Sequence, residues 1–215
     1  MKWIRHLSEN QIPYYIYKLH KNDHILYKTC VNKNKALIIL HGTICLFEIL
    51  PTQQMLPLAI LNKNNIINFA KLNMTRQSYY KLLAFETTYI ISFYIDHLNN
   101  QNTNQATFFL DIIESYQNTL IKYEIMNYIL THKYNKARII QLILFFCIEF
   151  GIISQNDIYI PLSIPQTTIA IITNSNKNTI NKILKQISNK ILIRYSSKKI
   201  ICIKNILDLD ASLLF

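Results

Sequence analysis

Residues 165–190, PQTTIAIITNSNKNTINKILKQISNK, contain two short apolar stripes separated by a cluster of Asn and Ser. Pro165 suits the first turn of a helix, where its missing N–H costs nothing. Asn174 lies where the chain must turn sharply, and Asn is the non-glycine residue that best tolerates a left-handed backbone. Ser175 or Asn176 can cap the helix that follows. The stretch therefore predicts a helix-turn-helix.

Each of these two helices has one apolar face. The first is expected to bury Ile169, Ile172 and Thr173, and its Ala170 is small enough to let another helix approach closely. The second has a buried stripe at helical spacing, made of Ile180, Ile183, Leu184 and Ile187. Downstream, ILIRY and IICIKN flank SSKK, which predicts a β-hairpin with a basic tip. A hairpin beside a helix-turn-helix is the winged variant of the motif.

The charge of this region is of one sign. No Asp or Glu occurs from Ile158 to Leu207, while Lys and Arg recur throughout, and the whole chain has a net charge of +11. A solvated surface normally mixes signs, so a basic surface of this length points to a polyanion. A chance run in a lysine-rich sequence is the alternative. Together with the tight turn and the hairpin, the charge favours DNA.

Geometry assigns roles to the exposed residues of the motif. The N-terminal part of the second helix can reach base edges in the major groove, where Lys donates to guanine and Asn pairs with adenine. The predicted base-reading residues are Lys177, Asn178 and Asn181, with Thr179 beside them. The predicted phosphate contacts, which position the protein without reading sequence, are Gln166, Thr167, Lys182, Lys198 and Lys199.

The N-terminal part of the chain has a β signal from about residue 13 to 97. Segments rich in β-branched and aromatic residues alternate with turn-like Asn, Lys and Pro, at 24–30, 35–50, 55–62 and 79–95. Gly42, in the middle of a strong strand pattern, indicates a tight turn or bulge. Several short strands in succession predict a sandwich or roll.

After a polar break at 97–105 the period changes to steps of four and three. The residues that follow this heptad seam are Phe109, Ile113, Tyr116, Leu120, Tyr123, Asn127 and Leu130. They predict one long helix that ends near His132 and pairs with a second copy, with Asn127 as a polar position that fixes the register. Alternatively, the helix lies on its own β domain, or Asn127 is exposed at the end of the contact. A second helix is predicted over 135–151, ended by Gly151 as its C′ residue.

Other classes of protein find little support. The four cysteines form no C-x-x-C pair, which predicts buried free thiols and no metal site, and His20 and His24 lack a third ligand. No phosphate-binding Gly-rich loop, G-x-S-x-G or H-E-x-x-H is present, so an enzyme is not expected. An RNA-binding protein is disfavoured because the aromatic residues lie away from the lysines. Without an apolar signal segment or a bilayer-length run, the chain is expected to be soluble.

The predicted order of a β-roll, a long helix and a winged helix-turn-helix resembles the Crp–Fnr family of transcription regulators over almost the whole chain. KARIIQLILFFCIEFGI, IPLSIPQTTIAIITNSNKNTINKILKQI and LTHKY are most similar to NtcA-type global nitrogen regulators of cyanobacteria and red-algal plastids. The resemblance implies an α+β fold with a cyclic-nucleotide-binding-like antiparallel β-roll (1–103), a dimerisation helix (104–134) and a winged helix-turn-helix DNA-binding domain (135–215).

The resemblance also implies a function. It predicts a homodimeric activator that binds a palindromic site on double-stranded DNA near promoters of nitrogen-controlled genes and contacts RNA polymerase. The abundance of Ile, Asn, Lys and Tyr, whose codons are AT-rich, fits a plastid stroma, with a bacterial cytoplasm as the alternative. A regulator of the same family that has a different effector, or none, and no link to nitrogen is the alternative function.

The resemblance implies 2-oxoglutarate as a possible effector and no tightly bound cofactor. Arg76 and Glu124 match effector-binding positions of the family, but Thr119 replaces a family Arg. The loss of a bidentate guanidinium predicts weakened, altered or lost control by a dicarboxylate. A cyclic nucleotide is not expected, because residues 67–80 lack the Gly-Glu pair and the closely following Arg of the phosphate cassette.

Overall fold

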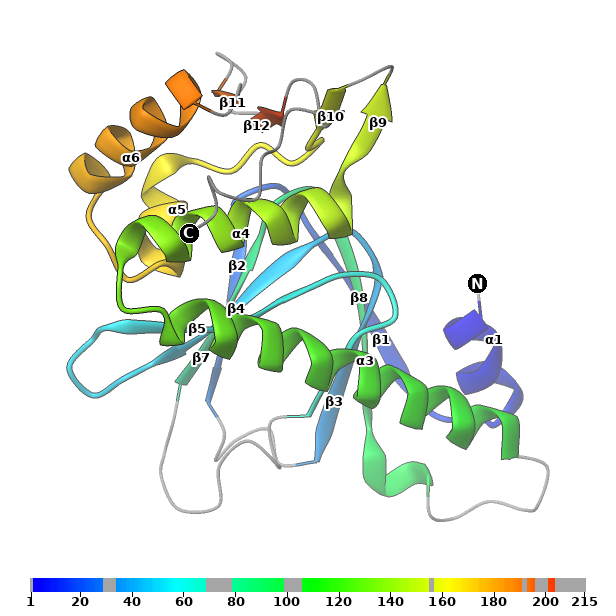
Figure 1. Cartoon of the computed structure of the whole chain (residues 1–215). Coiled ribbons are helices and arrows are strands. Elements are labelled where there is room, and N and C mark those ends of the chain that lie inside the picture. Colours follow the sequence, from blue (N-terminus) through cyan, green and yellow to red (C-terminus); the bar gives the residue numbers. More distant parts are fainter. Residues whose placement is uncertain are drawn as a thin grey trace. The chain divides into compact units, whose positions relative to one another are not determined.

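A computed structural model describes residues 2–28, 34–68, 79–98, 106–154, 157–190, 193–195 and 201–203, the last two segments and 189–190 by their backbone only. The chain divides into two compact units, Met1–Met126 and Asn127–Phe215. The helix predicted over 104–134 is α3 (Ala106–Thr131), and the division between the units falls inside it. Each unit is described by itself (Figure 1).

The described residues of the first unit form two short helices, eight strands and most of α3. The helices are α1 (Lys2–Glu9) and the 3-10 helix η1 (Ile95–Leu98). The strands are β1 (Tyr14–Leu19), β2 (His24–Lys28), β3 (Lys35–His41), β4 (Ile44–Ile49), β5 (Met55–Leu61), β6 (Ile66–Asn68), β7 (Tyr79–Ala84) and β8 (Thr88–Tyr94). The predicted strand regions are confirmed, whereas α1, β1 and β6 were not predicted individually.

The strands form two four-stranded antiparallel sheets, ordered β1-β8-β3-β6 and β2-β7-β4-β5, which make the predicted β-roll. The chain passes from β3 in one sheet to β4 in the other through Gly42, whose φ is +89°. A side chain there would place its Cβ 2.7 Å from the carbonyl oxygen of Thr87. The predicted tight turn is therefore confirmed, and glycine is required for both its conformation and its space.

Two layers of core explain why β3 is apolar at successive positions. Leu37 and Ile39 face the other sheet, where they pack among residues of β4, β5 and β7. Ala36 and Ile38 face the opposite way and pack against α1 and the first turns of α3. Because successive strand residues point to opposite faces, a strand that is covered on both sides loses its polar alternation.

The helix α1 packs its two buried residues, Trp3 and Leu7, into the layer beneath α3. Trp3 Nε1 donates to Asn64 Oδ1 at 3.1 Å. Asp111 of α3 joins α1 to α3, since its carboxylate accepts from Lys2 Nζ at 2.6 Å and from His6 Nε2 at 2.9 Å. Burial acts to raise the pKa of Asp111, but the bonds from Lys2 and His6 outweigh it and hold that pKa below its ordinary value.

Where the second unit is described, it has the end of α3, three further helices and a small antiparallel sheet. The helices are α4 (Asn135–Phe150), α5 (Gln166–Ile172) and α6 (Lys177–Lys190), and the sheet has the order β11-β12-β10-β9. Its strands are β9 (Ile152–Ser154), β10 (Asp157–Tyr159), β11 (Ile193–Tyr195) and β12 (Ile201–Ile203). The antiparallel pair β11–β12 is the predicted hairpin. The α+β fold class, with a roll, a long helix and a winged helix-turn-helix, is thus confirmed.

Gly151 ends α4 as predicted, but not for the predicted reason. A C′ glycine usually adopts the left-handed conformation, whereas Gly151 has a φ of −67° and an extended backbone. Its lack of a side chain matters for space, because an added Cβ would lie 2.7 Å from Ile158 Cγ2 and would also clash with the carbonyl of Cys147. The carbonyl of Cys147 and the side chain of Ile158 on β10 together leave room only for glycine at this C-cap position.

The cysteines within the described residues behave as predicted. Cys45 and Cys147 are buried and free, and burial raises the pKa of Cys45 and raises that of Cys147 to about 12. In the described part of the chain, no three His, Cys, Asp or Glu side chains gather closely enough to hold a metal ion. Nor does any described helix have the length and apolar character needed to cross a bilayer.

Candidate nucleic-acid interface and effector pocket

The turn between α5 and α6 has the predicted geometry. Asn174 has a φ of +50°, in the left-handed region. Of the two predicted caps, Asn176 caps the N-terminus of α6, because its Oδ1 accepts a hydrogen bond from the N–H of Thr179 at 2.8 Å. The hydroxyl groups of Thr173 and Ser175 lie 2.8 Å apart and stiffen the turn. Pro165 is the N-cap of α5 rather than a residue of its first turn.

Burial follows the two predicted apolar stripes. The side chains buried in α5 and its C-cap are Thr168, Ile169, Ala170, Ile172 and Thr173, and those buried in α6 are Ile180, Ile183, Leu184 and Ile187. A helix held by one face presents the opposite face to solvent. The stripe on α6 therefore fixes which of its polar side chains are available to a partner.

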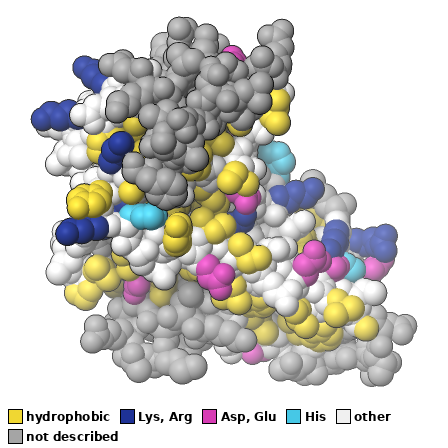
Figure 2. Space-filling model, in the orientation of Figure 1, with side chains coloured by type: hydrophobic (Ala, Val, Ile, Leu, Met, Phe, Trp, Pro, Cys, Tyr) yellow, Lys and Arg dark blue, Asp and Glu magenta, His cyan; other side chains and the backbone are white. Residues whose placement is uncertain are grey.

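The predicted DNA-binding residues of α5 and α6 lie on the free face of the motif. Lys177, Asn178 and Lys182 are exposed, and Asn181 and Thr179 are half-buried. At the start of α5, Thr167 is exposed and Gln166 is half-buried. Dark blue lysine side chains project from the region of α6 in Figure 2. Lys198 and Lys199 lie outside the described residues.

The exposed apolar residues of α3 only partly match the predicted seam. Phe109, Ile113 and Leu120 are exposed, Leu120 to 58%, and Asn127 is also exposed. The remaining seam residues, Tyr116, Tyr123 and Leu130, are half-buried. Further exposed apolar residues on the helix are Leu110, Ile121 and Tyr128, which seam spacing did not single out. Figure 2 shows hydrophobic side chains gathered along α3.

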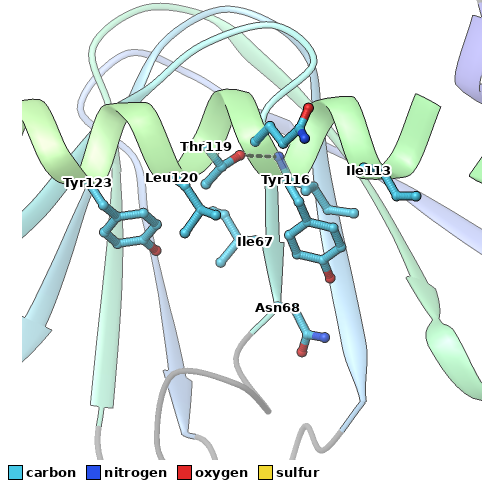
Figure 3. A pocket seen from close by; sticks show the side chains of 9 residues that line it. Ile67, Asn68, Ile113, Tyr116, Thr119, Leu120 and Tyr123 are labelled. Carbon is cyan, nitrogen blue, oxygen red and sulfur yellow. Dashed lines mark hydrogen bonds between the residues drawn. The ribbon is translucent and has the colours of Figure 1, made fainter. Parts of the chain in front are cut away.

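Tyr116 and Tyr123 instead line a cavity of about 410 Å³ between α3 and β6 (Figure 3). The lining residues are Ile66, Ile67, Asn68, Ile113, Tyr116, Gln117, Thr119, Leu120 and Tyr123. Burial raises the pKa of both tyrosines. Both phenols therefore stay neutral at pH 7. None of the described lining residues carries a positive charge.

The hydroxyl of Thr119 both accepts and donates a hydrogen bond. Its oxygen accepts from the N–H of Ile66 at 2.9 Å, and its O–H donates to the carbonyl oxygen of Ser115 at 2.8 Å. Among the described strands, β6 lies at the edge of its sheet, so within this part of the chain no further strand pairs with its outward N–H. Thr119 thus ties α3 to the β-roll directly (Figure 3).

Of the two predicted effector residues, the structure describes only Glu124. Glu124 is exposed on α3 and does not line the cavity. Arg76 lies outside the described residues. Two hydrogen-bonded contacts were not predicted from the sequence, that of Thr119 with β6 and that of Arg138 with the carbonyls of His132 and Thr173. Both join residues far apart in the sequence or engage backbone atoms, which leave no local pattern.

Comparison with known proteins places this geometry in a class. No family model matches the chain. It is 24% identical over 199 residues to the HTH-type transcriptional regulator ycf28 of Porphyra purpurea, covering 93% of this chain and 82% of that protein. It is 21% identical over 198 residues to the global nitrogen regulator of Synechococcus elongatus, covering 91% and 89%. A CRP-family transcriptional regulator from Thermus thermophilus, TTHB099, has a TM-score of 0.67 at 13% identity, covering 92% and 94%.

The fold is therefore that of the Crp–Fnr regulators, and the resemblance predicted from the sequence is confirmed. The curated proteins that the chain resembles are transcription regulators, and its similarity to the global nitrogen regulators among them is distant.

Proposed function

We propose that the protein binds a palindromic DNA site as a homodimer and regulates transcription from nearby promoters. The observation that carries this proposal is the free face of α6, where Lys177 and Asn178 are exposed at the start of a helix held by a tight turn. No carboxylate occurs from Ile158 to Leu207 to repel a phosphate backbone.

The residues divide into two roles. Lys177, Asn178 and Asn181, with Thr179, read base edges, because the N-terminal residues of a recognition helix enter the major groove. The phosphate contacts are Gln166, Thr167, Lys182, Lys198 and Lys199, which hold the helix in register without reading sequence.

The homodimer is supported by the apolar surface of α3. Six large apolar side chains of this helix are exposed on the single chain, namely Phe109, Leu110, Ile113, Leu120, Ile121 and Tyr128. Exposed apolar patches on a helix mark contact surfaces, and the seam of Phe109, Ile113, Tyr116, Leu120, Tyr123, Asn127 and Leu130 has heptad spacing. Two helices paired along α3 would present two copies of α6 to the two half-sites of a palindrome.

The proposal further includes activation of nitrogen-controlled genes and a location in the plastid. It is supported by similarity to global nitrogen regulators and to ycf28 of a red alga. Contact with RNA polymerase and residence in the plastid stroma, or in a bacterial cytoplasm, follow from the same similarity.

We also propose that the protein does not bind a dicarboxylate effector through an arginine of α3. It either binds a different effector or binds none. Thr119 stands in place of that arginine, and its hydroxyl is hydrogen-bonded to the backbone of Ile66 and of Ser115. The described cavity lining is mostly apolar, and an anion buried there without a cationic partner would be costly. Control by 2-oxoglutarate, through Arg76 and Glu124, remains the alternative.

Fluorescence anisotropy tests these points together. The protein is titrated onto a palindromic promoter site of a cyanobacterial global nitrogen regulator and onto its scrambled duplex, with and without 2-oxoglutarate. We expect preference for the palindrome and no change with 2-oxoglutarate. Equal affinity for both duplexes would refute sequence-specific regulation, whereas preference that tightens with 2-oxoglutarate would refute only the proposed loss of that effector. Lys199→Ala should weaken both duplexes alike and lower the salt slope by about one unit.

A further inference from the structure

Arg138, near the start of α4, contacts backbone carbonyls at the ends of two other helices. Its Nε donates to the carbonyl oxygen of His132 at 2.7 Å, and its Nη1 donates to that of Thr173 at 3.4 Å. His132 follows the end of α3 at Thr131, and Thr173 is the C-cap of α5. Within the second unit, this side chain thus connects the end of the long helix to the turn of the helix-turn-helix.

Helix electrostatics explain why a cation suits the place. The last carbonyls of a helix lack intrahelical partners and carry partial negative charge, which a cation stabilises. Arg138 lies near the positive end of its own helix, where a cation is disfavoured, so α4 itself does not account for it. A planar guanidinium with five donors is the side chain suited to satisfy two carbonyls at once.

Both carbonyls belong to segments that are themselves held in place. The ring of His132 packs edge-on against Tyr128, with 5.0 Å between the ring centroids. The hydroxyl of Thr173 donates to the backbone of α5 at 2.8 Å and contacts the hydroxyl of Ser175 at 2.8 Å. Asn174, with its left-handed backbone, comes next and directs the chain into α6. Fixing the Thr173 carbonyl therefore fixes the direction in which α6 leaves the turn.

We propose that Arg138 is a positioning residue that sets the half-site spacing the dimer accepts. The inference rests on the proposed function, in which α3 pairs two chains and α6 reads DNA. One inserted base pair moves a half-site by about 3.4 Å and rotates it by about 35°. A fixed connection between the end of α3 and α6 makes binding sensitive to such a change, and a loose connection tolerates it.

The test measures anisotropy on duplexes with constant half-sites and spacers lengthened or shortened by one and two base pairs. Wild type is compared with Arg138→Met, with Arg138→Lys and with Lys136→Met, a change at an exposed position of the same helix. We expect Arg138→Met to lose about tenfold in affinity at the preferred spacing, as for one charge-assisted hydrogen bond, and little at the others. Its spacing profile is then flatter than that of wild type. Arg138→Lys should recover part of the preference, and Lys136→Met should follow wild type.

Affinity for a scrambled duplex and its salt dependence should not change, because Arg138 is not a proposed DNA contact. The inference is overturned if Arg138→Met keeps the wild-type spacing profile. It is also overturned if Arg138→Met binds duplexes of every spacing more weakly by the same factor and unfolds at a lower temperature. That result would show a purely structural role. A failure of the proposed function is distinguishable, because wild type itself would then show no preference for any palindrome or spacing.

Discussion

Replacing Thr119 by Val tests whether α3 is tied to the β-roll by a side chain. Valine has nearly the same shape and a similar helix propensity, so the change removes the hydroxyl and little else. The N–H of Ile66, in a residue that is only 1% exposed, then loses its acceptor. An unsatisfied buried donor costs about 1–3 kcal/mol, a large part of the roughly 5–15 kcal/mol that holds a domain folded.

Urea unfolding followed by tryptophan fluorescence measures this cost. Trp3 is the sole tryptophan, and it is buried in the layer that β6 and α3 share, so its signal reports on the first unit. Protomer concentration is held constant, because association contributes to apparent stability. Thr107→Val, at an exposed position of the same helix, is the matched control and should change stability by no more than about 0.5 kcal/mol. Equal midpoints and slopes for Thr119→Val and wild type would show that the Thr119–Ile66 bond does not hold α3 on the roll.

Three further changes have defined outcomes. Lys177→Ala should cost about 1–3 kcal/mol on the preferred duplex and relax its sequence preference, and unchanged preference would mean that the recognition helix is misassigned. Gly42→Ala should destabilise the first unit by about 1–3 kcal/mol in urea, because it forces a side chain into a positive φ; wild-type stability would contradict the strained turn. Because the folded pKa of Asp111 is lowered, its contribution is complete above the unfolded value of about 3.9 and is lost as pH falls through the lower folded value. Asp111→Asn should therefore flatten the pH dependence of stability below about pH 4, and an unchanged acid transition would count against that role.

The helix-turn-helix could be predicted almost residue by residue because its signals are local. Asn174 indicates the left-handed turn. Asn176 caps α6, because its Oδ1 accepts a hydrogen bond from the N–H three residues later, and the apolar stripe repeats within one helix. The strands could be located for the same reason. Each of these features depends on residues only a few positions apart.

The remaining features depend on tertiary contacts. α1 has only two buried apolar residues, Trp3 and Leu7, too few for a periodic pattern. The half-burial of Tyr116 and Tyr123 shows that part of the predicted seam belongs to a cavity with β6, which heptad spacing alone does not reveal. The role of Gly151 was misjudged because the space left by the Cys147 carbonyl and the Ile158 side chain, not the backbone angle, requires the missing Cβ.

Selection of duplexes from a random-sequence pool tests the central claim most directly. The full-length protein is incubated with the pool, and bound duplexes are recovered, amplified and sequenced over several rounds. Two copies of α6 related by a two-fold axis should enrich an inverted repeat whose half-site centres lie one helical turn apart, about 34–36 Å. Enrichment of no sequence, or of a single unrepeated motif, would contradict a dimer that reads a palindrome.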